Sequence, residues 1–117
     1  MAQSRIEIFA EMAKQQPGEA MIWYGLASEY MKAERWLEAV EALQTVVGIN
    51  PDYTAAYQLL GTALTNNGQM EEARRAWTDG IEVAKRTGAW KAQQHMEGLL
   101  ESATTTSVSQ PGAEFCD

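Results

Sequence analysis

The side chains that most often perform chemistry in enzymes are scarce in this chain. It contains a single histidine, His95, and a single cysteine, Cys116, which stands next to the last residue. Neither a structural zinc site nor a Cys–His catalytic pair is credible with one histidine and one cysteine in the C-terminal tail. His95 lies beside Ala92 and Met96, so we interpret it as a half-buried packing residue at the edge of an apolar helix face.

Carboxylates are numerous, but their positions favour helix starts over acid–base catalysis. Glu38, Glu41, Glu71 and Glu72 fall near the beginnings of predicted helices, where negative charge complements the helix dipole. Glu71 and Arg75 have the spacing of an ion pair on a solvated helix face. The sequence has no glycine motif of the kind that cradles phosphate. We therefore predict no catalytic residues, no metal site and no cofactor, and we expect a protein that is not an enzyme.

The length and net charge of the chain indicate its domain count and argue against some classes of partner. The chain has 117 residues, of which 45% are hydrophobic, which is enough for one domain with a core. The formal net charge of -7 argues against nucleic-acid binding, because there is no excess of Lys and Arg to neutralise phosphates. The opening MAQSRIEIFA does not read as a signal peptide, and no stretch reads as a spanning segment. We expect a cytoplasmic protein without nucleic-acid or membrane partners.

Helical periodicity dominates the chain, and strand signals are poor. Apolar or small residues recur at the spacing of one helix face in about six stretches. The stretches are separated by Pro17-Gly18, by Asn50-Pro51-Asp52, by Asn66-Asn67-Gly68 and by other short polar turns. From Thr104 onward the sequence TTTSVSQPGAEFCD loses this periodicity. We predict a helical domain over residues 1–103 and a flexible C-terminal tail over residues 104–117.

Two of the predicted helical hairpins repeat each other in one register. A shift of 34 positions places Pro17 on Pro51 and retains apolar or small character at eight further positions. The superposed pairs are Trp23 and Tyr57, Leu26 and Leu60, Ala27 and Gly61, Tyr30 and Leu64, Ala39 and Ala73, Leu43 and Trp77, Val46 and Gly80, and Val47 and Ile81. A single register over both helices indicates an internal repeat. A glycine inside a helix costs about 1 kcal/mol relative to Ala, so Gly80 predicts a close approach of the last helix.

These two units resemble the tetratricopeptide repeat family. The first reads W-x2-L-A-x2-Y before Ala39 and Pro51, and the second reads Y-x2-L-G-x2-L before Ala73 and Trp77. The departures are Leu43 for an aromatic residue, Leu64 for Tyr and Lys85 for the closing Pro. The resemblance covers roughly residues 17–86. It implies an all-α, right-handed helical-hairpin solenoid with two full repeats, at about 20–53 and about 54–87, between a half-repeat and a capping helix at about 90–103.

The resemblance also implies where a partner would bind. In this family the first helix of each unit lines a concave groove that holds extended or helical peptides. The matching positions in the first repeat are Met21, Tyr24, Gly25, Ser28, Met31 and Lys32. Those in the second repeat are Ala55, Gln58, Leu59, Thr62, Thr65 and Asn66. Helical geometry independently turns Tyr24 and Gln58 away from the packed stripe.

The composition of this groove indicates the kind of peptide. Met and Tyr adapt to peptide side chains, Gln and Asn can pair with a peptide backbone, and Lys32 is the single cation. Family members that clamp a C-terminal carboxylate use positions that Tyr24, Ser28 and Leu59 occupy here, and these cannot supply that role. We therefore expect a neutral to basic protein or peptide partner, and not the acidic C-terminal tails of chaperones.

Alternatives to a peptide groove remain open at the level of sequence. The groove residues are equally compatible with solvated surface or with cover for the last helix. The chain could also form homo-oligomers through its open solenoid ends or its C-terminal tail. Trp36 falls at a hairpin turn, where we expect it to pack within its repeat, whereas an exposed Trp90 would mark a contact site.

Overall fold

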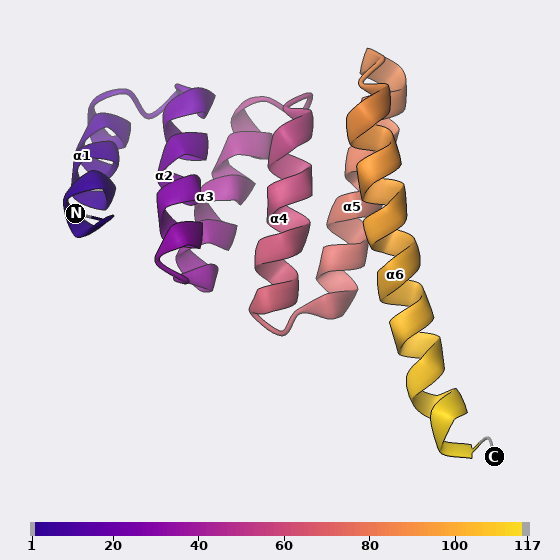
Figure 1. Cartoon of the computed structure of the whole chain (residues 1–117). Coiled ribbons are helices and arrows are strands. Elements are labelled where there is room, and N and C mark those ends of the chain that lie inside the picture. Colours follow the sequence, from indigo (N-terminus) through magenta and orange to yellow (C-terminus); the bar gives the residue numbers. More distant parts are fainter. Residues whose placement is uncertain (1, 116–117) are drawn as a thin grey trace.

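A computed structural model describes the backbone of residues 2–115 and the side chains of residues 5–103. The described backbone is helical and contains no strand. The helices are α1 (Ala2–Gln15), α2 (Ala20–Lys32), α3 (Trp36–Ile49), α4 (Thr54–Asn66), α5 (Met70–Thr87) and α6 (Trp90–Phe115). They stand side by side in a row of antiparallel hairpins (Figure 1), which extends over 57 × 32 × 19 Å. The predicted all-α solenoid is confirmed.

Turn residues set the ends of the helices. Gly68 and Gly88 both adopt φ 79°, in the left-handed region that glycine enters without a steric penalty. Asn50 begins the loop between α3 and α4, where its side-chain Oδ1 accepts a hydrogen bond of 3.1 Å from the backbone N–H of Asp52. These loops are short, so consecutive helices must pack against each other.

The two repeats are fixed by the same hydrogen bond at equivalent positions. The indole Nε1–H of Trp23 donates to the carbonyl oxygen of Pro17 at 2.9 Å, and the Tyr57 hydroxyl donates to that of Pro51 at 2.8 Å. Each bond joins the first helix of a repeat to the loop that precedes it. The Pro and the aromatic residue that recur in the sequence therefore hydrogen-bond to each other in both repeats.

Small residues in the core let the helices approach closely. A Cβ atom built on Gly61 would lie 2.0 Å from Nε1 of Trp77, and one on Gly80 would lie 2.5 Å from Sδ of Met96. Because real Cβ atoms do not come so close, both positions require glycine for this packing. The close approach of the last helix that Gly80 predicts is confirmed, and Met96 on α6 is fully buried.

The last helix differs from its predicted length. The structure continues α6 to Phe115, whereas the loss of periodicity predicts an end near Ala103. Thr and Ser have moderate helix propensities, and no Gly or Pro lies between Ala103 and Pro111, so nothing in the sequence stops the helix at Ala103. The flexibility of residues 104–117 stays a prediction, and Cys116 lies outside the described residues.

Candidate peptide-binding groove

A hollow between α2, α4 and α6 brings together five of the residues predicted to line the groove. Its volume is 220 Å³. It is lined by Tyr24 of α2, by His95 of α6 and by four residues of α4, which are Ala55, Gln58, Leu59 and Thr62. This α2–α4 hollow contains no carboxylate among its lining residues, and it combines one aromatic ring with amide, hydroxyl and imidazole groups.

His95 lines the α2–α4 hollow, whereas its place in the sequence predicts a packing role. The prediction of a half-buried packing residue is wrong, because the His95 side chain is exposed and lines the α2–α4 hollow. The neighbouring Met96 occupies the core instead, together with Ala92 and Ala103 at the spacing of one helix face.

Tyr24 is less exposed than its predicted position implies. Its ring stacks on that of Tyr53, with 5.2 Å between the centroids and 25° between the planes, and it packs against the core. Burial, and to a lesser extent the nearby Tyr53 phenol, raises the pKa of Tyr24 above its ordinary value. The Tyr24 hydroxyl is therefore protonated at neutral pH and can donate a hydrogen bond to a ligand. Leu59, which lines the α2–α4 hollow, and Met31 also pack against the core.

The polar groove residues differ in whether their hydrogen bonds are already formed. The hydroxyl of Thr62 donates to the carbonyl oxygen of Gln58 at 3.3 Å, and that of Thr65 donates to the carbonyl oxygen of Gly61 at 2.9 Å. Within the described side chains, the amide group of Gln58 has no partner. Gln58 is therefore the groove side chain best able to pair with a peptide backbone.

The ammonium group of Lys32 already forms an ion pair with Glu29. Its Nζ lies 3.4 Å from a carboxylate oxygen of Glu29, whose side chain is only 5% exposed. Nε of Arg5 lies 3.2 Å from the other oxygen of Glu29, so this pair of cations ties α1 to α2 around one buried carboxylate. Lys32 therefore contributes less positive charge to the groove than its sequence position implies.

A second hollow lies between α1 and α2. It has a volume of 570 Å³ and is lined by Phe9, Met12, Glu19, Met21, Ile22, Tyr24 and Gly25. Gly25 permits this arrangement, because a Cβ atom there would lie 2.5 Å from Cε1 of Phe9. Tyr24 borders both hollows, and Met21 stands at the mouth with 66% of its surface exposed. The α1–α2 hollow is therefore mostly apolar, with Glu19 as its one charged group.

The other predicted groove residues lie outside these two hollows. They are Ser28, Met31, Lys32, Thr65 and Asn66. Ser28 and Thr65 are partly buried and Asn66 is exposed at the end of α4. Phe9 and Met12 are not among the predicted groove residues. The sequence predicts α1 as a packing helix of a half-repeat, and its edge borders the groove only after α1 has docked on α2.

The described part of the chain holds neither a cluster of metal ligands nor a membrane-spanning helix. No group of three or more His, Cys, Asp or Glu residues there could hold a metal ion. Across those same residues, no helix combines the length and apolar character needed to cross a membrane. The cytoplasmic location stays a prediction.

A row of helical hairpins with an internal repeat defines a helical-repeat protein, and the comparisons identify its family. Residues 30–94 match the sequence profile of the tetratricopeptide repeat. The chain is also 33% identical over 95 residues to a TPR repeat-containing protein of Pseudomonas aeruginosa, an alignment that covers 81% of this chain and 90% of the relative. The chain belongs to the tetratricopeptide repeat family.

Solved structures agree with this fold. A protein from Bordetella parapertussis superposes with a TM-score of 0.75 at 23% identity, covering 86% of this chain and 88% of that one. A tetratricopeptide repeat domain protein from Salinibacter ruber superposes with a TM-score of 0.69 at 26% identity, covering 74% and 88%. The family and the fold support a role in protein–protein interaction, and members of this family are typically non-catalytic.

Proposed function

We propose that this chain is a non-catalytic interaction module that holds a peptide segment of a partner protein in the groove formed by the two hollows. The observation that carries this proposal is the α2–α4 hollow, where Tyr24, Gln58 and His95 converge from three helices. Each supplies a different contact to a peptide: an aromatic face with a hydroxyl donor, an amide for the backbone, and an imidazole.

The two hollows suit different parts of one ligand. An apolar side chain of the peptide enters the α1–α2 hollow, whose lining is mostly carbon and sulfur. The adjoining peptide backbone pairs with Gln58, on the other side of Tyr24. Glu19 is exposed and has no ion-pair partner among the described side chains, so a basic residue next to the apolar anchor is favoured.

Selection from a random peptide display library tests this proposal. The informative variant is Ala55→Arg, because Ala55 is exposed and lines the α2–α4 hollow, so an arginine there fills the hollow without removing core packing. Thr78→Arg adds the same side chain at an exposed position of α5 outside both hollows and serves as the matched control.

We expect peptides with an apolar anchor beside a neutral or basic residue to be enriched on the unmodified chain and on Thr78→Arg. Ala55→Arg should lose that enrichment while keeping its helical circular dichroism. Equal enrichment on Ala55→Arg would show that the groove is not the binding surface.

A further inference from the structure

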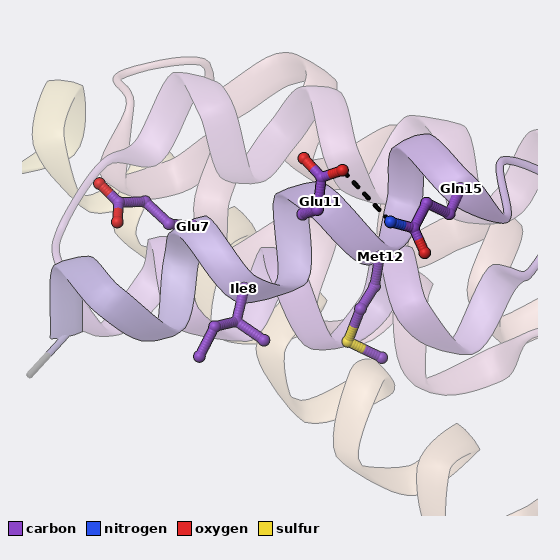
Figure 2. A pocket seen from close by; sticks show the side chains of 5 residues that line it. All are labelled: Glu7, Ile8, Glu11, Met12 and Gln15. Atoms are coloured by element: carbon purple, nitrogen blue, oxygen red, sulfur yellow. Dashed lines mark hydrogen bonds between the residues drawn. The ribbon is translucent and has the colours of Figure 1, made fainter.

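One face of α1 carries two exposed apolar side chains, of which Met12 also borders the α1–α2 hollow. Ile8 is 58% exposed and Met12 is 37% exposed. Figure 2 shows both residues along one side of α1, with Glu7, Glu11 and Gln15 beside them. Together these five residues, here called the α1 outer face, line a hollow of 420 Å³.

The internal repeat shows that these two positions are normally buried. Continuing the shift of 34 residues backwards places Ile8 on Ala42 of α3 and Met12 on Val46. Ala42 is 4% exposed and Val46 is fully buried. On α5 the equivalent residues are Ala76 and Gly80, and both are buried as well. An exposed pair on α1 is therefore an exception within this molecule.

The structure also shows what covers the equivalent positions. Ala76 borders a hollow together with Leu60 and Leu64 of α4, and a Cβ atom on Gly80 would lie 2.6 Å from Cβ of Tyr57, also on α4. The cover is thus the first helix of the same repeat, packed antiparallel to the second. Among the described helices α1 packs against α2 alone, so no such helix covers Ile8 and Met12, and an amphipathic helix is the kind of element that this face suits.

Charge distinguishes between candidate occupants. Within residues 5–103, Glu7 has no ion pair or hydrogen bond, while Glu11 lies 3.9 Å from Nζ of Lys14 and accepts a hydrogen bond from Gln15. A second copy that stacked its α6 on this face would bring Glu97 and Glu101 against these acids, because both are exposed on α6. Like charges at an interface disfavour binding, so a basic partner fits better than a second copy.

We propose that the α1 outer face is a second docking surface, which binds an amphipathic helix of another protein. The apolar side of that helix covers Ile8 and Met12, and its Lys or Arg residues lie opposite Glu7 and Glu11. The bound helix takes the place that the first helix of a repeat takes on α3 and α5. This surface shares Met12 with the α1–α2 hollow but none of its residues with the α2–α4 hollow, so Ala55→Arg separates the two proposals.

A designed peptide tests the proposal without knowledge of the natural partner. The probe is a fluorescein-labelled helix of about 18 residues, long enough to be helical in water, with Leu at i, i+3, i+4 and i+7 and Lys elsewhere. Its control has Glu in place of every Lys. The protein variants are Ile8→Lys and Glu7→Gln, and the matched control is Leu37→Lys, since Leu37 is 55% exposed on α3.

We expect the Lys peptide to bind the full chain, more weakly at high salt, and the Glu peptide not to bind. Ile8→Lys should raise the Kd about tenfold or more, as loss of a central apolar anchor does. Glu7→Gln should weaken binding less and reduce its salt dependence, whereas Leu37→Lys and Ala55→Arg should bind as the unmodified chain does. Because Ile8 is mostly exposed, Ile8→Lys should keep its helical circular dichroism.

Three results would overturn the proposal. Equal binding by Ile8→Lys and Leu37→Lys would show that the peptide does not use α1. Loss of binding in Ala55→Arg alone would place the peptide in the groove. A rise of mass with concentration that Ile8→Lys abolishes and Leu37→Lys does not would make a second copy the occupant.

Discussion

At the scale of single residues, glycines and the side chains facing them decide how closely the helices pack. The Trp77 indole lies across Gly61, and its Nε1–H donates to the carbonyl oxygen of Gln58 at 3.3 Å. The same indole therefore packs in the core and hydrogen-bonds to the backbone of Gln58, whose side chain lines the α2–α4 hollow. Packing and the geometry of the candidate site are coupled through this contact.

Gly61→Ala should destabilise the fold, because its methyl group would overlap the Trp77 ring. We expect a loss of about 1–3 kcal/mol in the free energy of unfolding, the range for overpacked cores. Gly98→Ala is the matched control, since a Cβ atom there meets nothing within 4 Å. That change should instead stabilise α6 by up to about 1 kcal/mol. Urea denaturation of both variants measures the difference, and similar values for the two would contradict the packing described.

Trp77→Ala should be among the most damaging substitutions in the chain. The side chain is 4% exposed, and its removal should lower the free energy of unfolding by about 3–5 kcal/mol. Trp90 is 60% exposed, so Trp90→Ala should change it by no more than about 0.5 kcal/mol. If the losses were equal, Trp90 would be a core residue and the register of α6 would be wrong.

Two tyrosines make stability depend on alkaline pH. Burial raises the pKa of Tyr24 and of Tyr57, so the folded chain holds these protons more tightly than the unfolded chain does. Stability is therefore fully present below the unfolded pKa of about 10 and is lost as the pH rises through the raised folded values. The double variant Tyr24→Phe/Tyr57→Phe should lose less stability between pH 9 and 12, as followed by urea midpoints. An unchanged pH dependence would mean that these phenols are not protected by burial.

Residue roles were harder to predict from sequence than residue positions. Five of the predicted groove residues line the α2–α4 hollow together, but the sequence did not predict the contribution of α6 to it. Tyr24 illustrates the reason: its partner Tyr53 precedes α4, and a periodicity within one helix carries no information about a ring supplied by the next loop. Tertiary contacts of this kind determine how much of a groove residue is available to a ligand.

At the scale of helices, the sequence was a good guide to where elements begin and how they repeat. Pro17 and Pro51 precede equivalent helices and accept equivalent hydrogen bonds, so the repeat found in the sequence is also a repeat of contacts. The end of α6 was predicted less well, because a helix that leaves the core has no apolar stripe to reveal it. Propensity alone then decides its length, and propensity is a weak signal.

Deleting residues 104–117 tests the boundary between the core and the tail. We expect the urea midpoint to stay the same, because the C-terminal part of α6 extends beyond the end of α5 (Figure 1). Far-UV circular dichroism per molecule should fall, because the structure continues α6 to Phe115, and an unchanged signal would show a flexible tail instead. A large drop in the urea midpoint would show that the tail is structural and that the domain extends beyond Ala103.

At the scale of the whole molecule, the chain is a short solenoid whose two ends differ. The C-terminal end is closed by α6, which presents Glu97, Glu101 and other polar residues to solvent. The N-terminal end presents Ile8 and Met12 of α1. Between the ends lies the proposed peptide groove, and the α1 outer face is the second docking surface that we propose. Such a module could hold two segments of partner protein at once.

The most direct test of the groove is to locate a bound peptide by nuclear magnetic resonance. The unmodified chain, labelled with ¹⁵N, is titrated with a peptide enriched by the display selection. We expect amide shift changes concentrated at Tyr24, Ala55, Gln58, Thr62 and His95, and their loss in Ala55→Arg. Changes confined to the α1 outer face, or spread over α5 and away from α2 and α4, would contradict it.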